Sequence, residues 1–380
     1  MTRTLKGPRY GFTENGERRT ENYPMTHKKY RIAVIAGDGI GQEVIPAGLS
    51  VLGTVAERCG FSLDLTEFPW GCDFYTKHRR MMDEDGFQRL ADFEAIYFGA
   101  VGHPAVPDHV SVWELILPIR QRFDQYVNLR PMRMLPGVPS PLANRSAAEV
   151  DMICVRENSE GEYAGSGGRI HVGTPHEIAE QTAIFTRGGI ERIVRYAFEL
   201  ARRRPRKELA SATKSNALQF SMVLWDQVVE AVQREYPDVT CRKYHVDALC
   251  ARMVTHPQTL DVIVGSNLFG DIITDLGAAI SGSLGLAASG NINPERRFPS
   301  MFEPIHGSAP DIAGRGIANP IGAIWAGALM LHHLGQSEGH DLMMGAIAKV
   351  LATGKGLTPD LGGQGTTSQL AAAVKAALGN

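Results

Sequence analysis

The stretch from Asp261 to Asp275, DVIVGSNLFGDIITD, constrains the fold of this 380-residue chain more than any other segment. It opens with a short apolar run of β-branched residues that stops at a Gly-Ser-Asn turn signal, which is typical of a buried strand in a parallel sheet. The helix predicted next carries Asp271 and Asp275, which project from one face because they lie four residues apart. The stretch predicts an α/β unit with two acids just beyond the carboxyl end of a strand, where open α/β sheets bind ligands.

The paired acids Asp271 and Asp275 have two interpretations. Like charges on adjacent helical turns repel, and a hard divalent cation bound through carboxylate oxygens would remove that repulsion. Alternatively, both are solvated aspartates near the start of a helix, where the helix dipole favours negative charge. This stretch alone does not decide between a metal site and a solvated helix start.

Composition excludes several classes of protein. The formal net charge is -2, so no overall basic field favours nucleic acid. The one dense basic run, Arg202–Lys207, is interpreted as a solvated helix end. The sequence contains no run of about 18 uncharged apolar residues, which is the length that a membrane-spanning helix needs. Five scattered cysteines without a CxxC pair favour reduced thiols in a cytoplasmic protein over a disulfide framework or a zinc site.

The first 27 residues differ from the rest of the chain. Residues 1–27 are polar, with few aliphatic side chains and no periodicity, so we predict a disordered extension. They contain no apolar segment of the kind found in secretory signals. Met25 could be an alternative start, and the sequence leaves open whether residues 1–27 are native.

From Tyr30 onward, strand-like and helix-like segments alternate, which predicts a parallel sheet. The first predicted turn, AGDGIG, has Gly37, Gly39 and Gly41 in the spacing G-x-G-x-G. It therefore lacks the G-x-G-x-x-G spacing of a Rossmann dinucleotide site. A tight strand-to-helix turn and a cofactor-facing loop both remain open as interpretations of this turn.

Charged residues follow several predicted strands. Arg156, Lys214, Asp247 and Asp271 each come directly after a strand-like segment, a recurrence that favours a shared site at one edge of the sheet. Arginines also end separate elements, at positions Arg120, Arg130 and Arg156. Guanidinium groups that converge can grip a substrate with several carboxylates bidentately, but spacing alone cannot show that they converge.

Eight segments together resemble one family, the metal-dependent β-decarboxylating dehydrogenases, which include isopropylmalate, isocitrate and tartrate/D-malate dehydrogenases. The matching segments are AGDGIG, LPIRQ, VNLRP, VRENSEGEY, TKSNALQ, YHVDAL, GSNLFGDIITDLGAA and EPIHGSAPDIAGRGIANP. The resemblance runs from about residue 30 to the end. It implies an α/β, isopropylmalate dehydrogenase-like two-domain fold, with a central sheet shared between the domains and a non-Rossmann nucleotide site.

The resemblance also implies domains and site residues. Residues 28–124 and 283–380 would form the large cofactor-binding domain, and residues 125–282 the small domain with a dimerisation arm and the metal and substrate residues. The residues implied to hold substrate carboxylates are Arg120, Arg130 and Arg156. The implied ligands of Mg²⁺ or Mn²⁺ are Asp247, Asp271 and Asp275. The residues implied to bind the nucleotide are Asn216, His306, Gly307, Ser308, Ala309, Asp311 and Asn319.

The implied catalytic residues are Tyr163, Lys214 and Asp247. Tyr163 would donate a proton after decarboxylation, and Lys214 would take the hydroxyl proton directly or through water. Lys214 and Asp247 would complete the site of the neighbouring subunit in a homodimer. The predicted cofactor is NAD, because a carboxylate at Asp311 would accept a hydrogen bond from a ribose 2′-hydroxyl and repel a 2′-phosphate. Whether K⁺ is also required stays open.

The pattern from Trp113 to Arg120, WELILPIR, most resembles tartrate and D-malate dehydrogenases, although Glu114 stands where that group has a small residue. We therefore expect an NAD-dependent enzyme that decarboxylates D-malate to pyruvate and CO₂, oxidises tartrate, or does both. The alternatives are a 3-isopropylmalate dehydrogenase, with Ile116 and Leu117 as its alkyl pocket, and a catalytically silent regulatory subunit. A substrate of small 2-hydroxy dicarboxylate type, and neither nucleic acid nor membrane, is the expected partner.

Overall fold

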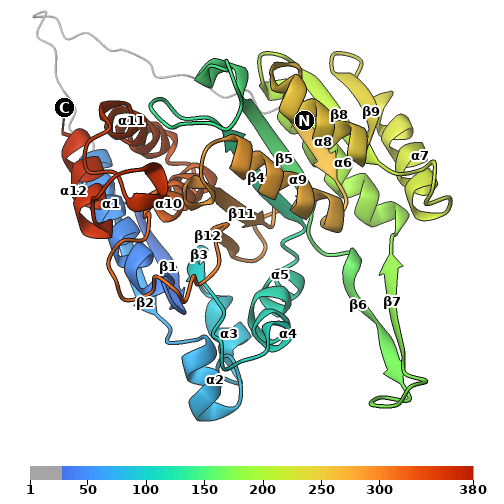
Figure 1. Ribbon diagram of the computed structural model, residues 1–380, viewed down its shortest axis with the longest axis horizontal. Helices are drawn as coiled ribbons and strands as arrows, with labels where there is room; N and C mark the ends of the chain where they lie inside the picture. Colours follow the sequence, from blue (N-terminus) through green and yellow to red (C-terminus); the bar gives the residue numbers. More distant parts are fainter. Residues whose placement is uncertain (1–27, 380) are drawn as a thin grey trace, which may run out of the picture.

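The computed structural model describes residues 28–379, so the extension predicted over residues 1–27 lies outside the described residues. A ten-stranded sheet forms the centre of the molecule (Figure 1). Its strands, in spatial order, are β2 (Phe61–Glu67), β1 (Lys28–Gly37), β3 (Ala95–Ala100), β12 (Ser300–Pro304), β11 (Ala288–Ile292), β4 (Val127–Arg133), β5 (Asp151–Glu157), β10 (Val262–Gly265), β8 (Glu208–Thr213) and β9 (Thr240–His245). A separate ribbon of β6 (Gly161–Ile170) and β7 (Ile178–Ile184) stands away from the body.

The two ends of the sheet come from different parts of the chain. Residues 28–124 and 283–379 supply β1, β2, β3, β11 and β12, whereas residues 125–282 supply β4, β5, β8, β9 and β10. One mixed α/β sheet therefore runs through both parts, as the expected fold class requires. The boundary between β11 and β4 coincides with the predicted domain division, and the division itself stays a prediction.

Alternating residues of the first strands face two helical layers. In β1, Ile32 and Val34 belong to one hydrophobic cluster, and Ala33 and Ile35 belong to another. Both faces are buried, which explains why this strand is a continuous apolar run. One layer consists of α1 (Gly41–Cys59), α10 (Ile321–His333), α11 (Ser337–Thr353) and α12 (Thr367–Ala377). The opposite layer consists of α2 (Cys72–His78), α3 (Gly86–Leu90), α4 (Asp108–Ser111), a π-helical turn (Val112–Ile116) and α5 (Leu117–Arg122).

The other end of the sheet is covered by α6 (Arg187–Arg203), α7 (Ser221–Gln233), α8 (Val246–Thr255) and α9 (Asn267–Ile280). Helix α9 contacts β4, β5 and the start of the ribbon at β6. This position places the predicted acids of α9 over the centre of the sheet. Among the helices of residues 28–379, none combines the length with the hydrophobicity that a membrane span requires.

The sheet is mixed, which corrects the expectation of parallel strands. Strand β11 is antiparallel to both β12 and β4, and β4 is antiparallel to β5. Residues 293–299 connect β11 to β12, and a connection that short can join only antiparallel neighbours. Helix α9 ends at Ile280, and β11 begins eight residues later at Ala288.

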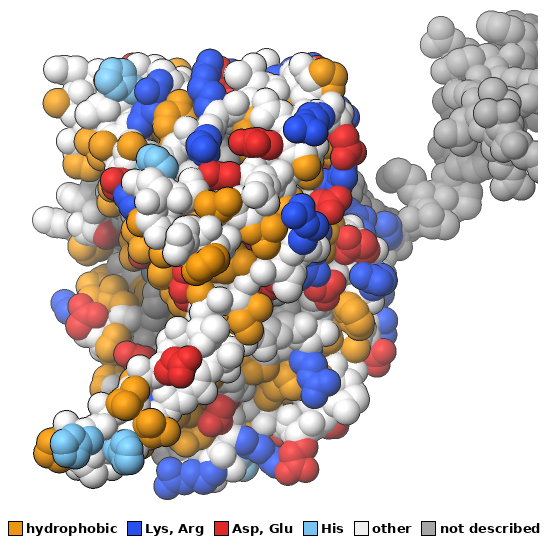
Figure 2. Space-filling view, turned by 90° about the vertical axis from the view of Figure 1, so that its right-hand side faces the viewer, with side chains coloured by type: hydrophobic (Ala, Val, Ile, Leu, Met, Phe, Trp, Pro, Cys, Tyr) orange, Lys and Arg blue, Asp and Glu red, His pale blue; other side chains and the backbone are white. Residues whose placement is uncertain are grey.

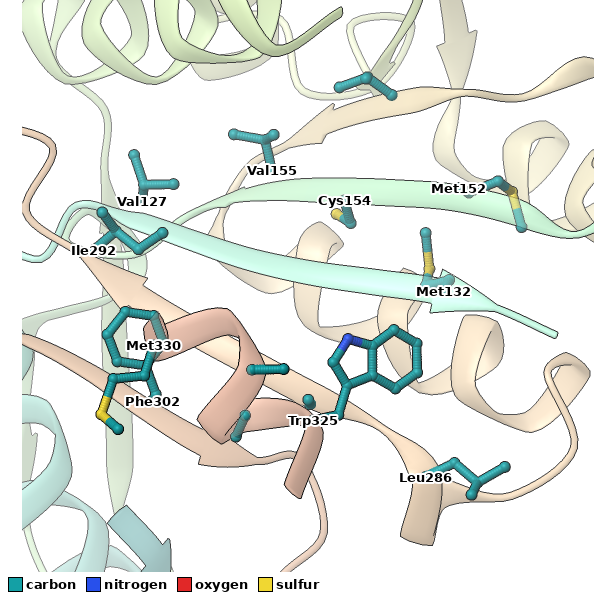
Figure 3. Packing of buried hydrophobic residues seen from close by; sticks show 14 of the residues in the cluster. Val127, Met132, Met152, Cys154, Val155, Leu286, Ile292, Phe302, Trp325 and Met330 are labelled. Atoms are coloured by element: carbon teal, nitrogen blue, oxygen red, sulfur yellow. The ribbon is translucent and has the colours of Figure 1, made fainter. Parts of the chain in front are cut away.

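A continuous core joins the two ends of the sheet (Figure 3). Val127 of β4 and Val155 of β5 pack in the same cluster as Ile292 of β11 and Phe302 of β12. Trp325 of α10 belongs to this cluster as well. The junction between the two parts of the chain is therefore packed with apolar side chains, alongside the buried pair Asn128 of β4 and Asn291 of β11.

The basic run Arg202–Lys207 is not simply solvated, which corrects its interpretation as a free helix end. Arg204 forms an ion pair with Asp261, whose side chain is only 1% exposed. Arg206 Nη2 lies 3.2 Å from the same carboxylate. These contacts fix the start of the Asp261–Gly265 segment against the end of α6.

Replacing Arg204 with methionine is expected to lower the free energy of unfolding by about 3 kcal/mol, because loss of one partner leaves a buried carboxylate poorly compensated. Arg202→Met is a matched control, since Arg202 pairs with Asp238 at the surface, where such pairs contribute about 1 kcal/mol or less. Urea unfolding at fixed protein concentration measures both variants. Equal losses for the two would contradict a buried role for Arg204.

Candidate active site

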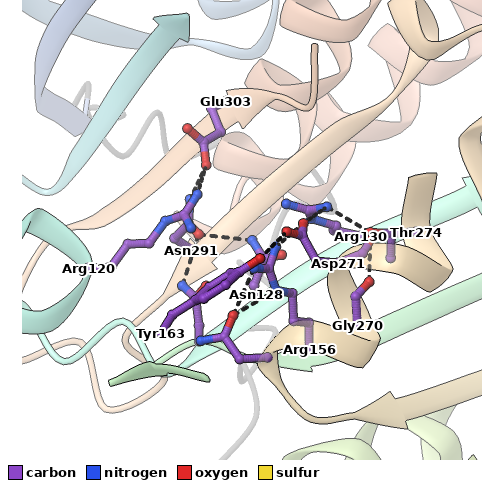
Figure 4. A network of polar contacts seen from close by, with 12 residues as sticks. Arg120, Asn128, Arg130, Arg156, Tyr163, Gly270, Asp271, Thr274, Asn291 and Glu303 are labelled. Carbon is purple, nitrogen blue, oxygen red and sulfur yellow. Dashed lines mark hydrogen bonds and ion pairs between the residues drawn. The ribbon is translucent and has the colours of Figure 1, made fainter. Parts of the chain in front are cut away.

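Three arginines, an aspartate and a tyrosine meet above the centre of the sheet (Figure 4). Arg130 comes from β4, Arg156 from the end of β5, and Tyr163 from the start of the ribbon strand β6. Asp271 lies on the second turn of α9, between the two arginines. The hydrogen bond from Arg130 to Asp271 thus joins residues that are 141 positions apart in the chain.

Asp271 is the common partner in this network. Its Oδ1 accepts hydrogen bonds from Arg156 Nη1 at 2.6 Å and from Arg130 Nη1 at 3.2 Å. Its Oδ2 accepts a hydrogen bond from the Tyr163 hydroxyl at 3.1 Å. Gly270 makes room for this arrangement, because a Cβ there would lie 2.5 Å from Arg156 Cγ. A larger residue at Gly270 would displace the buried arginine.

The third predicted arginine has a different partner. Arg120 Nη2 donates to Glu303 Oε1 at 2.7 Å, and both side chains are about nine-tenths buried. Glu303 also accepts a hydrogen bond from Asn291, which in turn accepts from Asn128 and Asn158. Glu303 is not among the predicted site residues, although it stands in the EPIHG segment. Neither β11 nor β12 was predicted as a strand, so nothing placed Glu303 near Arg120.

The charges of this network set its protonation. Burial, together with the like charge of Arg130, lowers the pKa of Arg156. Burial alone would raise the pKa of Asp271, but the charges of Arg156 and Arg130 outweigh it and lower that pKa. Burial and the charge of Asp271 raise the pKa of Tyr163, so its phenol keeps its proton at neutral pH. The network therefore combines an ionised carboxylate with a neutral proton donor.

Asp275 lies one turn beyond Asp271 at the exposed edge of α9. Its carboxylate makes no hydrogen bond or ion pair with any other residue of the 28–379 range. Partial burial and the charge of Asp271 raise its pKa, and Arg130 opposes them. Asp275 is thus an unpartnered carboxylate beside Asp271, and carboxylate oxygens of this kind suit a hard divalent cation.

The third predicted metal ligand is not part of this pair. Asp247, in the first turn of α8, accepts a hydrogen bond from Lys214 Nζ at 2.8 Å, which lowers the Asp247 pKa. Within residues 28–379, neither side chain bonds to the Asp271 network, and no three His, Cys, Asp or Glu side chains are placed to hold a metal ion. Asn216, two residues beyond Lys214, is exposed. Asp247 is therefore not brought to Asp271 and Asp275 within the described residues of one chain.

The predicted nucleotide loop lies against the glycine turn that follows β1. Ile40 N donates to Ser308 O at 2.9 Å, and a Cβ on Gly39 would lie 2.1 Å from that same oxygen. His306 is buried, which lowers its pKa, and its Nε2 has no partner among the described residues. The turn is thus tightly packed and also borders the loop, so its two interpretations are compatible.

Asp311 and Asn319 lie at the far part of this loop. Asp311 is exposed, whereas Asn319 is buried and donates to Asp360 Oδ2 at 2.9 Å. Asp360 also accepts a hydrogen bond from Ser283, so the C-terminal segment holds Asn319 in place. Gly307 and Ala309 flank Ser308, and Ala309 has a positive φ of 41°.

Comparison with known proteins gives three findings. The family model described as isocitrate/isopropylmalate dehydrogenase matches residues 31–374. The D-malate dehydrogenase [decarboxylating] of Escherichia coli is 54% identical over 91% of this chain and 98% of its own length. A probable tartrate dehydrogenase/decarboxylase of Agrobacterium vitis is 54% identical over 91% of this chain and 97% of its own length.

The fold is similar to that of a solved structure. The crystal structure of isocitrate dehydrogenase from Methylococcus capsulatus superposes with a TM-score of 0.83 and 34% sequence identity. The match covers 92% of this chain and 100% of that one. The likeness therefore extends over both ends of the sheet and the segments that carry the arginine network.

Proposed function

The chain belongs to the isocitrate/isopropylmalate dehydrogenase family, and from the chemistry of its site we propose that it oxidises D-malate or tartrate with NAD. The observation that carries this proposal is the convergence of Arg130, Arg156 and Tyr163 on Asp271. The arginines suit a dicarboxylate, and the phenol supplies a proton. Relatives named for D-malate and tartrate, each 54% identical, support the choice of substrate.

The arginines have donors to spare for a substrate. Arg120 and Arg130 each carry a buried Nε with no hydrogen-bond partner among residues 28–379. Buried polar groups rarely stay unpaired, so these positions favour a ligand that accepts hydrogen bonds. A carboxylate can accept two parallel bonds from one guanidinium group. A small 2-hydroxy dicarboxylate would therefore satisfy donors that the protein leaves unsatisfied.

In the proposed reaction, Lys214 takes the proton of the substrate hydroxyl directly or through water. Bound NAD would accept the hydride, and bound Mg²⁺ or Mn²⁺ would act as a Lewis acid on the ketone oxygen. Loss of the β-carboxylate of malate as CO₂ leaves an enolate. The O–H bond of Tyr163 then breaks, and its proton forms a C–H bond at the carbon that lost CO₂, which gives pyruvate.

We assign the divalent cation to Asp271 and Asp275, together with Asp247 of a second copy. The first two acids lie side by side, whereas Asp247 and Lys214 form a separate exposed pair whose carboxylate side chain is 68% exposed. If Asp247 and Lys214 of one subunit reached the Asp271 site of its neighbour, Asp247 would be the third metal ligand and Lys214 the base. A homodimer would thus complete two equivalent sites.

The projecting ribbon supports the homodimer. Ile170, Val172 and Ile178 are each more than half exposed near its tip. Figure 2 shows hydrophobic and histidine side chains gathered there, away from the body. Exposed apolar side chains on an isolated strand pair are unfavourable in water, so a second copy that packs against the ribbon would cover them.

The choice of NAD rests on Asp311. Its carboxylate is exposed on the loop that also carries His306 and Ser308. At the ribose it would accept a hydrogen bond from a 2′-hydroxyl and repel a 2′-phosphate. We therefore expect NAD to be reduced in preference to NADP.

The test is NAD and NADP reduction with Mn²⁺, comparing D-malate, L-tartrate, meso-tartrate and 3-isopropylmalate at matched concentrations. The expected result is turnover of D-malate or tartrate with NAD. Preference for 3-isopropylmalate would overturn the substrate assignment and would indicate that Ile116 and Leu117 form a pocket for the isopropyl group. Leu117 is only 6% exposed, so it offers little surface to such a group. No turnover by folded, dimeric protein would favour a silent regulatory subunit.

A further inference from the structure

The side chain of Trp113 contacts the projecting ribbon at Gly165 of β6. A Cβ built on Gly165 would lie 3.0 Å from both Cη2 and Cζ3 of Trp113, so the indole edge rests on the Gly165 backbone. Trp113 belongs to the π-helical turn before α5, seven residues before Arg120. The helical segment that carries one substrate arginine therefore contacts the strand that carries Tyr163.

Gly165 ends an irregular part of the ribbon. Gly161 pairs with Ile184 and Ser166 pairs with Thr182, so four residues of β6 stand opposite one residue of β7. Tyr163 lies within this bulge, and Gly165 has a φ of +76°, which glycine adopts without strain. Bulges re-aim side chains, and this one turns the Tyr163 hydroxyl toward Asp271.

Ladder hydrogen bonds are interrupted over the bulge, so other contacts must hold it. On the partner strand, Gln181 Nε2 donates to Glu162 O at 2.9 Å. On the Gly165 side, the contact is the Trp113 indole, which packs on a backbone that has no side chain to keep it away. A 40% exposed tryptophan in this place is not explained by burial in the core.

We propose that Trp113 is a positioning residue for Tyr163. Its indole supports the bulge at Gly165, so that the phenol stays at Asp271 and faces the substrate held by Arg120. The role rests on the proposed function, because it acts through the proton that Tyr163 delivers. The contact between Trp113 and Gly165 is independent of that function.

The kinetic test compares Trp113→Ala with Trp113→Phe in the dimeric enzyme, with D-malate as substrate. Trp113→Ala is expected to lower kcat about 10- to 100-fold with little change in KM, because a misplacement of about 1 Å can cost on that order. Trp113→Phe keeps an aromatic ring over Gly165 and is expected to recover most of the loss. An unchanged kcat, a loss confined to KM, or no recovery with phenylalanine would overturn the positioning role.

Glycine variants test the contact itself. Gly165→Ala places a methyl group against the indole, whereas Gly173→Ala has similar left-handed strain, with a φ of +78°, and nothing within 4 Å. We expect Gly165→Ala to lower kcat far more than Gly173→Ala. In the Trp113→Ala background the effect of Gly165→Ala should shrink, because the methyl group no longer meets a ring.

Acrylamide quenching follows the contact without turnover. The other tryptophans, Trp70, Trp225 and Trp325, are at most 4% exposed, so quenching reports on Trp113. Gly165→Ala is expected to raise the quenching constant and Gly173→Ala to leave it unchanged; equal constants would overturn the contact. If the wild-type enzyme turned over none of its proposed substrates, the role in proton delivery would fall with the proposed function, and quenching would still decide the contact.

Discussion

Asp271→Asn is expected to lower kcat for D-malate by about 10³-fold, since the change removes several kcal/mol of transition-state stabilisation. The carboxylate binds Arg130, Arg156 and Tyr163 at once and stands beside Asp275, where the cation would bind. Asparagine has the same shape, but its amide group cannot accept from both arginines and the tyrosine without turning an N–H toward one of them. The variant should therefore lose metal affinity and tyrosine placement together.

Two measurements check this expectation. Mn²⁺ affinity, measured by calorimetry on the dimer, should fall with kcat. Asp64→Asn is the matched control, because it makes the same chemical change far from the site. Asp64 forms a surface ion pair with Lys29. Retention of more than about a tenth of kcat by folded Asp271→Asn protein would contradict the proposed role, since one catalytic group commonly contributes at least about 10²-fold.

Lys214→Ala is expected to lower kcat by about 10²- to 10⁴-fold, the range for loss of a general acid or base. Lys214 Nζ already lies 2.8 Å from Asp247 Oδ1, and this contact holds the side chain at the end of β8. The neighbouring strand offers a control in Lys243→Ala, because Lys243 pairs with Asp226 instead. Steady-state assays at saturating NAD and Mn²⁺ compare the two variants. Equal activity in both would remove Lys214 from the mechanism.

Strands with continuous apolar runs could be predicted from the sequence, and strands lined with polar residues could not. The segment RIAVIAG alternates between two buried clusters, so its periodicity and its hydrophobicity agree. Strand β11 is ASGNI, with Ser289 and Asn291 buried. Asn291 donates to Glu303 of β12 and accepts from Asn128 of β4, whereas Ser289 Oγ has no partner among the described residues. Nothing in so short a polar segment distinguishes it from a turn, because its stability comes from partners on β4 and β12.

The same reason limits the prediction of the site. Arg156 ends β5 and Lys214 follows β8, and both strands run parallel to β10, so these two residues lie at one edge of the sheet. The site expected to unite Arg156, Lys214, Asp247 and Asp271 stays a prediction, because Lys214 and Asp247 pair with each other and not with Asp271. The pairing of Arg120 with Glu303 depends on β12, which was not predicted, so no spacing rule could have found it. The Trp113–Gly165 contact likewise joins two irregular segments, a π-helical turn and a bulge.

The most direct test of the central claim, that Lys214 of one copy serves the Asp271 site of another, is the activity of a mixed dimer. Asp271→Asn and Lys214→Ala chains with different tags are co-expressed, and only the heterodimer is isolated. A shared site predicts about half of wild-type activity with D-malate, since one of the two sites then has both natural residues. If each chain completes its own site, both sites of the heterodimer are defective, and an inactive heterodimer would contradict the claim.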